Sequence, residues 1–177
     1  FGFGLSYTTF SMRLKMIQEA EMGIMITVEV ENTGTAYPGR EVVQVYVTLP
    51  QTGMEKEYHR LAGFAKTKVL QPKEVQELTI CFEQKQFASY QEEECAWVME
   101  SGKYGIWIGK DSASVKLAAV VDVPETTIIE KTNRVCPKKA AFQDMKSSEY
   151  TKNKEQQWLA LAKETNPMTL SFLPRKE

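Results

Sequence analysis

The first two thirds of the chain alternate between apolar and polar residues with the period of a β-strand. Segment 22–31 turns four β-branched residues to one face: Ile24, Ile26, Val28 and Val30. Segment 41–49 follows the same pattern and ends at Pro50, which cannot donate to a β-ladder. Further segments of this kind lie near 7–16, 61–70, 75–82, 95–100, 103–109 and 113–121. About eight short strands separated by turn residues predict an all-β sandwich.

The segment after Pro124, which should end the last strand, has a different composition. Residues 125–153 are rich in Lys, Glu, Thr and Ser and show no clear period. A short helix is predicted near 154–164, because Asn153 can cap its first turn and Gln156, three residues later, completes a capping box. We therefore expect a C-terminal extension that contains one short helix.

The predicted helix has an apolar face made by Trp158, Leu161 and Ala162, and Asn166-Pro167 ends it. Disordered segments are depleted in such residues, so we expect the extension to dock onto something. It can dock back onto the sandwich or lead into another domain. The charged stretch 138–154 has the composition of a linker and favours the second alternative.

Composition excludes some classes of partner. The formal net charge is −1, which gives no electrostatic reason to expect binding to nucleic acid or to an anionic membrane. The chain lacks an apolar run of the roughly 18 residues that a membrane helix needs. It starts at Phe1 without a basic segment before an apolar one, so we expect it to be cut from a longer chain.

The three cysteines, Cys81, Cys95 and Cys136, are widely spaced. Their spacing does not match a zinc site. An odd number of cysteines favours reduced thiols and a reducing, cytoplasmic compartment, although the thiols can also be chance residues that carry no such information.

No set of residues assembles a catalytic, substrate-binding, cofactor or metal site. His59 stands alone in a charged loop and is expected to be solvated. Glu92, Glu93 and Glu94 are more simply an exposed loop than a carboxylate pair for glycoside cleavage. Gly4-Leu5-Ser6 lacks the second glycine of a nucleophile turn, and Phe1-Gly2-Phe3-Gly4 lacks the Lys-Ser or Lys-Thr of a phosphate loop.

Four aromatic residues, Tyr46, Trp97, Tyr104 and Trp107, lie on predicted strands. We expect Trp97 and Tyr104 in the core. Trp107 faces opposite Tyr104 on the same strand and is the candidate for an exposed or interface aromatic residue. A docking surface for another domain, ordinary packing and sugar stacking all remain open for it.

Several motifs occur in order along residues 1–121. The opening FGFGLSYTTF resembles the segment by which glycoside hydrolase family 3 enzymes enter their fibronectin type III-like domain. Four further matches follow it: Val30–Gly34 (V-x-N-T-G), Gly39–Val47 (G-x-E-V-V-Q-V-Y-V), Leu61–Lys66 (L-x-G-F-x-K), and Trp97 with Gly102–Tyr104 (W…G-x-Y). Leu70–Glu74 resembles L-x-P-G-E, except that Lys73 replaces the usual glycine.

The resemblance implies an immunoglobulin-like or fibronectin type III-like sandwich that packs against catalytic domains of the same parent chain. In this family an aspartate nucleophile lies on a TIM barrel and an acid/base residue usually lies on an α/β sandwich. Neither domain is within these residues, so we carry no catalytic residue over and expect the chain alone not to be an enzyme.

The resemblance also divides the chain. Residues 1–6 correspond to a linker from the α/β-sandwich domain, 7–123 to the fibronectin type III-like domain, and 124–177 to an extension or linker, as in members whose barrel comes last. The loop 50–60 can lend residues to the rim of the parent's active site. The rival interpretations are a carbohydrate-binding module, which needs exposed aromatic residues, and a protein-interaction module of adhesin type.

We predict three free thiols per chain, because no two cysteines lie on the same predicted strand. Thiol titration of the denatured, unreduced protein should give a value close to three. A value near one would instead indicate an intramolecular disulfide and an oxidising compartment.

Overall fold

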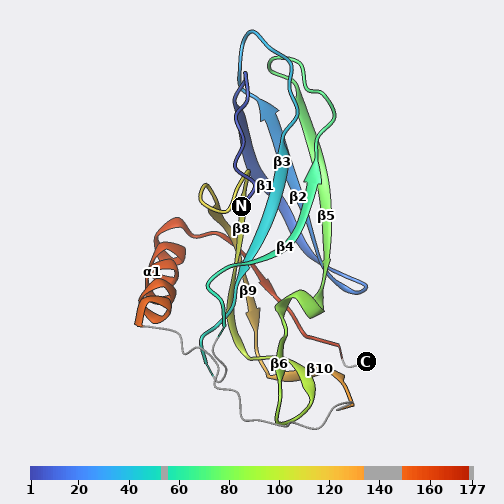
Figure 1. Ribbon diagram of the computed structural model, residues 1–177, viewed down its shortest axis with the longest axis vertical. Coiled ribbons are helices and arrows are strands. Elements are labelled where there is room, and N and C mark those ends of the chain that lie inside the picture. Colours follow the sequence, from blue (N-terminus) through green and yellow to red (C-terminus); the bar gives the residue numbers. More distant parts are fainter. Residues whose placement is uncertain (53–55, 134–148, 176–177) are drawn as a thin grey trace.

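The computed structural model describes residues 1–52, 56–133 and 149–175, which form three sheets, one α-helix and a single 3₁₀ turn (Figure 1). The β1 sheet has the order β1 (Phe10–Ala20), β2 (Gly23–Asn32), β5 (Val75–Glu83). The β3 sheet has the order β11 (Met168–Ser171), β9 (Lys116–Val123), β8 (Gly102–Gly109), β3 (Val42–Thr48), β4 (Arg60–Lys66). A small sheet has the order β10 (Thr127–Lys131), β7 (Ala96–Met99), β6 (Ser89–Gln91). The remaining elements are η1 (Gln84–Phe87) and α1 (Glu149–Thr165).

The core lies between the β1 sheet and the β3 sheet. Alternate residues of each strand point into it, because successive side chains of a strand lie on opposite faces. On β2 and β3 these are residues that the alternation predicted to be buried: Ile24, Ile26, Val28, Val30, Val43, Val45 and Val47. Tyr104 lies in the same core, and its hydroxyl donates to the carbonyl of Glu100 at 2.7 Å. The predicted all-β sandwich is confirmed.

The strands differ from the prediction mainly where the alternation is weak. The first begins at Phe10 rather than near residue 7 and continues to Ala20, with a register shift between Leu14 and Met16. Strands β6, β10 and β11 were not predicted, because they are only three to five residues long and lie in segments without a clear period. Pro124 therefore does not end the last strand.

The extension returns to the sandwich. Helix α1 lies against the outer face of the β3 sheet, and β11 then pairs with β9, the one parallel ladder among the described strands. Phe172, immediately after β11, is buried in the main core, where its ring stacks on Phe87 with centroids 6.5 Å apart. Of the two alternatives left open by the sequence, the structure thus shows docking onto the sandwich itself.

A second apolar cluster joins α1 to the β3 sheet. It consists of Tyr46, Trp107, Val120 and Trp158. Trp107 is only 7% exposed, and its indole N–H donates to the hydroxyl of Thr48 at 2.8 Å. Of the alternatives left open for Trp107, the structure shows packing: the residue lies on the outer face of the sheet, as the alternation indicated, and α1 covers that face.

Two details of the predicted helix are wrong. The helix begins at Glu149, so Asn153 lies inside it and does not cap it. Ala162 packs beside Trp158 as predicted, but Leu161 is 37% exposed and Leu159 packs against the cluster instead. Asn166 follows the helix in the left-handed conformation, with φ 45°, and its N–H donates to the carbonyl of Ala162.

His59 is packed against the same cluster, rather than solvated as expected. Its ring stacks on Tyr58 with centroids 4.1 Å apart and lies 5.0 Å from the ring of Trp107. Its Nε2 atom is buried and has no hydrogen-bond partner among the described residues. Burial, together with the positive charge of Lys154 on α1, lowers the pKa of His59 from 6.5 to about 4.

The end of the described chain is held by a side-chain amide. The amide oxygen of Gln84 accepts from the backbone N–H of Arg175 at 2.9 Å, and its Nε2 donates to the carbonyl of the same residue at 2.8 Å. The Arg175 guanidinium reaches the carboxylate of Glu19 and the carbonyl of Glu21. The extension is thereby attached to the β1–β2 hairpin as well as to the β3 sheet.

We predict that Phe172→Ala destabilises the chain by roughly 3–5 kcal/mol, because it removes a large side chain that the core closes around. Leu173→Ala is the matched control: its side chain is 59% exposed, so the loss should stay within about 0.5 kcal/mol. Urea unfolding followed by circular dichroism measures both. Equal effects of the two substitutions would mean that the extension is not part of the cooperative fold.

We predict that stability falls as the pH falls from about 6.5 towards 4. His59 has a lower pKa in the folded chain than in the unfolded chain, so the unfolded chain binds the proton more readily in this window. The slope due to His59 is at most about 1.4 kcal/mol per pH unit. His59→Phe keeps an aromatic ring and removes the titration, so thermal unfolding of the variant should lack this component. Parallel pH profiles for the two proteins would contradict the prediction.

Candidate docking surface

The N-terminal segment, residues 1–9, contains no strand and is fastened at both ends. The backbone N–H of Ser112 donates to the carbonyl of Phe1 at 3.0 Å. At the other end the hydroxyl of Thr8 donates to the side-chain oxygen of Asn32 at 2.6 Å. The segment therefore crosses the sandwich as a bridge between the β8–β9 loop and the end of β2.

Asn32 is a suitable anchor because its side chain is fully buried and all the hydrogen-bonding capacity of its amide is satisfied. Its Nδ2 donates to the carbonyls of Tyr37 and Leu70, both at 3.0 Å, and its oxygen also accepts from the N–H of Gly34. A side-chain amide has two donor hydrogens and one acceptor oxygen with two lone pairs, and all four are satisfied here. This residue is the asparagine of the V-x-N-T-G motif.

Residues 1–7 of the bridge are all exposed, and every second one of them has a large apolar side chain. Phe1, Phe3, Leu5 and Tyr7 are between 77% and 94% exposed. Tyr37, also exposed, lies beside Tyr7 with ring centroids 6.3 Å apart. Single exposed apolar residues are ordinary, but closely spaced large ones mark surfaces that bind another protein surface.

Gly2 is the point where the bridge approaches the β3 sheet. It has φ 77°, and a β-carbon there would lie 2.0 Å from the side-chain amide nitrogen of Gln44 on β3. At this residue the backbone of the bridge lies against the outer face of the β3 sheet. Phe64 on β4 is paired with Gln44 in the register and is 69% exposed, so it adds an apolar side chain to the same face.

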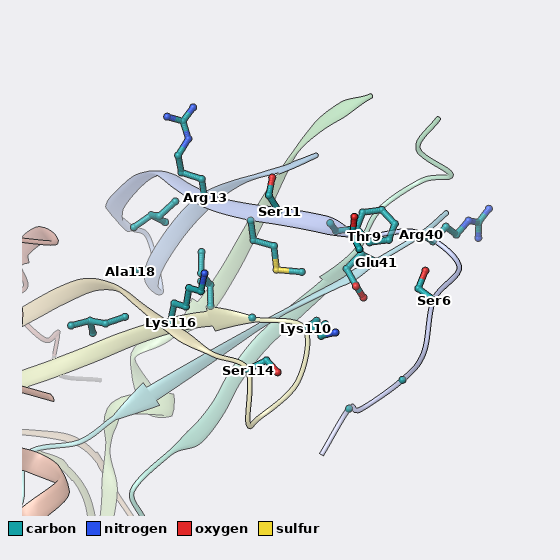
Figure 2. Close-up of a pocket in the computed structure, with 18 of the residues that line it drawn as sticks. Ser6, Thr9, Ser11, Arg13, Arg40, Glu41, Lys110, Ser114, Lys116 and Ala118 are labelled. Carbon is teal, nitrogen blue, oxygen red and sulfur yellow. The ribbon is translucent and has the colours of Figure 1, made fainter. Parts of the chain in front are cut away.

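A groove of about 880 Å³ runs beside the bridge (Figure 2). The bridge and β1 form one side, and β8, β9 and the loop between them form the other. Its apolar lining residues include Leu5, Phe10, Met12, Leu14, Ile108, Leu117, Ala118 and Pro167. The groove thus opens where the edges of the β1 sheet and the β3 sheet come together.

The charged side chains around the groove are mostly basic: Arg13, Arg40, Glu41, Lys110 and Lys116. Arg13 is paired with Glu29, whose pKa is lowered by hydrogen bonds from Arg13 and Lys15. The carboxylate of Glu41 accepts from the N–H of Val42. Within the described ranges, Arg40, Lys110 and Lys116 make no ion pair.

In the loop 50–60 the structure describes residues 50–52 and 56–60, and two of them make contacts with other parts of the chain. The Lys56 ammonium is buried, donating to the carbonyl of Pro50 at 2.7 Å and pairing with Glu100. The N–H of Gln51 donates to the Glu155 carboxylate on α1. This loop is fastened to the sandwich and the extension at several points.

The other residues considered from the sequence do not come together. Glu92, Glu93 and Glu94 lie in the exposed turn between β6 and β7, and Ser6 lies on the bridge. Trp97 packs partly against the main core, with the ammonium of Lys85 5.1 Å from its ring centroid. Cys81 and Cys95 are free thiols, and Cys136 lies outside the described residues.

Across the described ranges, groups of three His, Cys, Asp or Glu that could hold a metal ion are absent. No described helix is long and apolar enough to cross a membrane.

The sequence motifs indicated the bridge, but nothing in the alternation indicated the groove. Its basic residues come from three separate parts of the chain and meet only in the fold (Figure 2).

Comparison with known proteins connects this arrangement to one family. Residues 41–112 match the family described as "Fibronectin type III-like domain". A β-glucosidase of Ruminococcus albus is 37% identical over 150 residues, which cover 82% of this chain and 16% of that protein. β-Glucosidase A of Butyrivibrio fibrisolvens is 32% identical over 158 residues, covering 77% of this chain and 19% of that protein.

Solved structures agree. A β-glucosidase from Paenibacillus barengoltzii superposes with a TM-score of 0.69 at 30% identity, over 76% of this chain and 16% of that one. β-Glucosidase 3B from Thermotoga neapolitana, in complex with glucose, superposes with a TM-score of 0.65 at 34% identity, over 72% of this chain and 17% of that one. The chain spans less than a fifth of each of these relatives. It belongs to the fibronectin type III-like domains of the glycoside hydrolase family 3 β-glucosidases.

Proposed function

We propose that the chain is a non-catalytic domain of a family 3 glycoside hydrolase and that its N-terminal bridge packs against the catalytic domains of the same protein. In this proposal, residues 1–6 form the linker from the α/β-sandwich domain, and hydrolysis of β-glucosides belongs to the parent protein.

One observation carries the proposal. Phe1, Phe3, Leu5 and Tyr7 are exposed on a segment that is fixed at both ends, so they are presented rather than loose. Holding large apolar groups in water is unfavourable by about 25 cal/mol per Å² of apolar surface. A neighbouring domain that covers them recovers this energy without the cost of ordering a flexible tail.

The loop 50–60 has a smaller part in this proposal. The contacts of Gln51 and Lys56 fix this loop on the sandwich, from which it can contribute to the rim of the parent's active site. Sugar stacking by Trp107 has no support, since this residue is buried under α1.

The test is a pair of double variants in the parent protein. Phe3→Ser with Leu5→Ser removes two exposed apolar residues from the bridge. Met22→Ser with Leu173→Ser removes two exposed apolar residues from the opposite end of β1, where Arg175 meets Glu19. We expect the bridge variant to lower the unfolding temperature of the parent and to shorten the thermal lifetime of its aryl β-glucosidase activity, and the control variant to change neither.

The isolated chain provides the control. Neither double variant should change its unfolding temperature by more than about two degrees, since exposed positions contribute little. If the bridge variant and the control variant affect the parent equally, the bridge is not the docking surface.

A further inference from the structure

The basic groove beside the bridge has features that the proposed function does not explain. Lys110 and Lys116 flank its β8–β9 side, and Arg40 lies towards the end where the bridge meets β1 (Figure 2). These three cations have no ion-pair partner among the residues that the structure describes. The rest of the lining combines apolar side chains, such as Met12 and Leu117, with hydroxyl groups, such as those of Thr9 and Ser11.

We propose that this groove binds an extended acidic segment from the catalytic part of the parent protein. The bound segment would lie along β1. This inference rests on the proposed function, because the bridge and the groove then face the same partner. Charge complementarity identifies the occupant: the groove offers cations without ion pairs, and among the described residues that line it Glu41 is the only acidic one.

The groove is continuous with the bridge. Gly2, Gly4, Leu5 and Ser6 belong to the bridge and also line the groove. A partner surface that covers Phe3 and Leu5 therefore extends over the groove mouth as well. An extended segment on that partner surface would therefore lie next to the groove.

The groove also has the shape that an extended chain needs. Strand β1 pairs with β2 along one edge, and its other edge has no strand partner in the described part of the chain. On the facing side β11 pairs with β9 only from Ala119 onwards, which leaves Lys116 to Ala118 without a ladder on that side. Free strand edges bind extended segments through backbone hydrogen bonds, and side-chain pockets between them supply specificity.

The experiment uses the isolated chain labelled with ¹⁵N and a capped peptide of alternating Asp and Val, about eight residues long, which matches a strand in length. We expect amide shifts at residues 9–14 and 108–118. Raising NaCl from about 50 to about 500 mM should weaken the affinity at least about five-fold, because salt screens exposed charges. A capped peptide of alternating Lys and Val should not bind.

Two charge-reversal variants make the test specific. Lys110→Glu with Lys116→Glu should weaken the acidic peptide at least about five-fold. Lys103→Glu with Lys131→Glu makes the same change in net charge outside the groove and should leave the affinity unchanged. Equal binding of the acidic and basic peptides, shifts confined to other residues, or no binding at all would overturn the proposal; the last result would mean that the cations only protect a strand edge.

The parent protein separates this inference from the proposed function. There, the Lys110→Glu and Lys116→Glu variant should lower the unfolding temperature at low salt more than the Lys103→Glu and Lys131→Glu variant does. If the bridge variant destabilises the parent while both charge-reversal variants behave alike, the docking surface stands and the groove proposal fails. If the bridge variant has no effect, the proposed function itself fails.

Discussion

The β3 sheet is apolar on both faces, and the rest of the molecule follows from the need to cover them. Its inner face closes the main core against the β1 sheet. Its outer face carries Tyr46, Trp107 and Val120, which a sandwich of two sheets would leave in water. Two segments outside the main strands lie on this face: α1 covers one part of it, and the bridge contacts another part at Gln44.

The two covers behave differently because of what each turns outward. Helix α1 buries Trp158 and presents mainly polar residues to solvent, so it completes the fold. The bridge contacts the sheet at Gly2 and leaves its large apolar side chains in solvent: Phe1, Phe3, Leu5 and Tyr7. The bridge can thus lie on the sheet and, at the same time, present an apolar surface to a partner. The buried amide of Asn32 is what keeps that presentation rigid.

Much of the sandwich could be predicted, because alternation records which face of a strand is buried. The pattern of Ile24, Ile26, Val28 and Val30 needed no tertiary information. Lys73 is also understandable from the sequence: it stands where a glycine is usual, and its φ of 67° is a conformation that glycine adopts without strain.

The rest depended on contacts between distant parts of the chain. The period showed that Trp107 and Tyr104 face opposite ways, but the residue that covers Trp107 comes from the C-terminal helix. Strand β11 is too short to recognise and exists only because β9 offers an edge. The groove could not be foreseen for the same reason. Each of its basic side chains is an ordinary surface residue in the sequence. They line one groove only because the fold brings β1 and the β8–β9 loop together.

The late position of Phe172 has a consequence for synthesis on the ribosome. All strands of the sandwich except β11 precede residue 132, so the nascent chain can assemble them while α1 is still being made. Until Trp158 and Phe172 emerge, the face around Trp107 stays open and the core lacks one of its large side chains. Partly closed species of this kind expose apolar surface and tend to aggregate. The parallel pairing of β11 with β9, across a long stretch of chain, is also a slow contact to form. The domain is therefore complete only after Phe172 has been synthesised. A pause in translation before this residue would prolong the time during which its apolar surface is exposed.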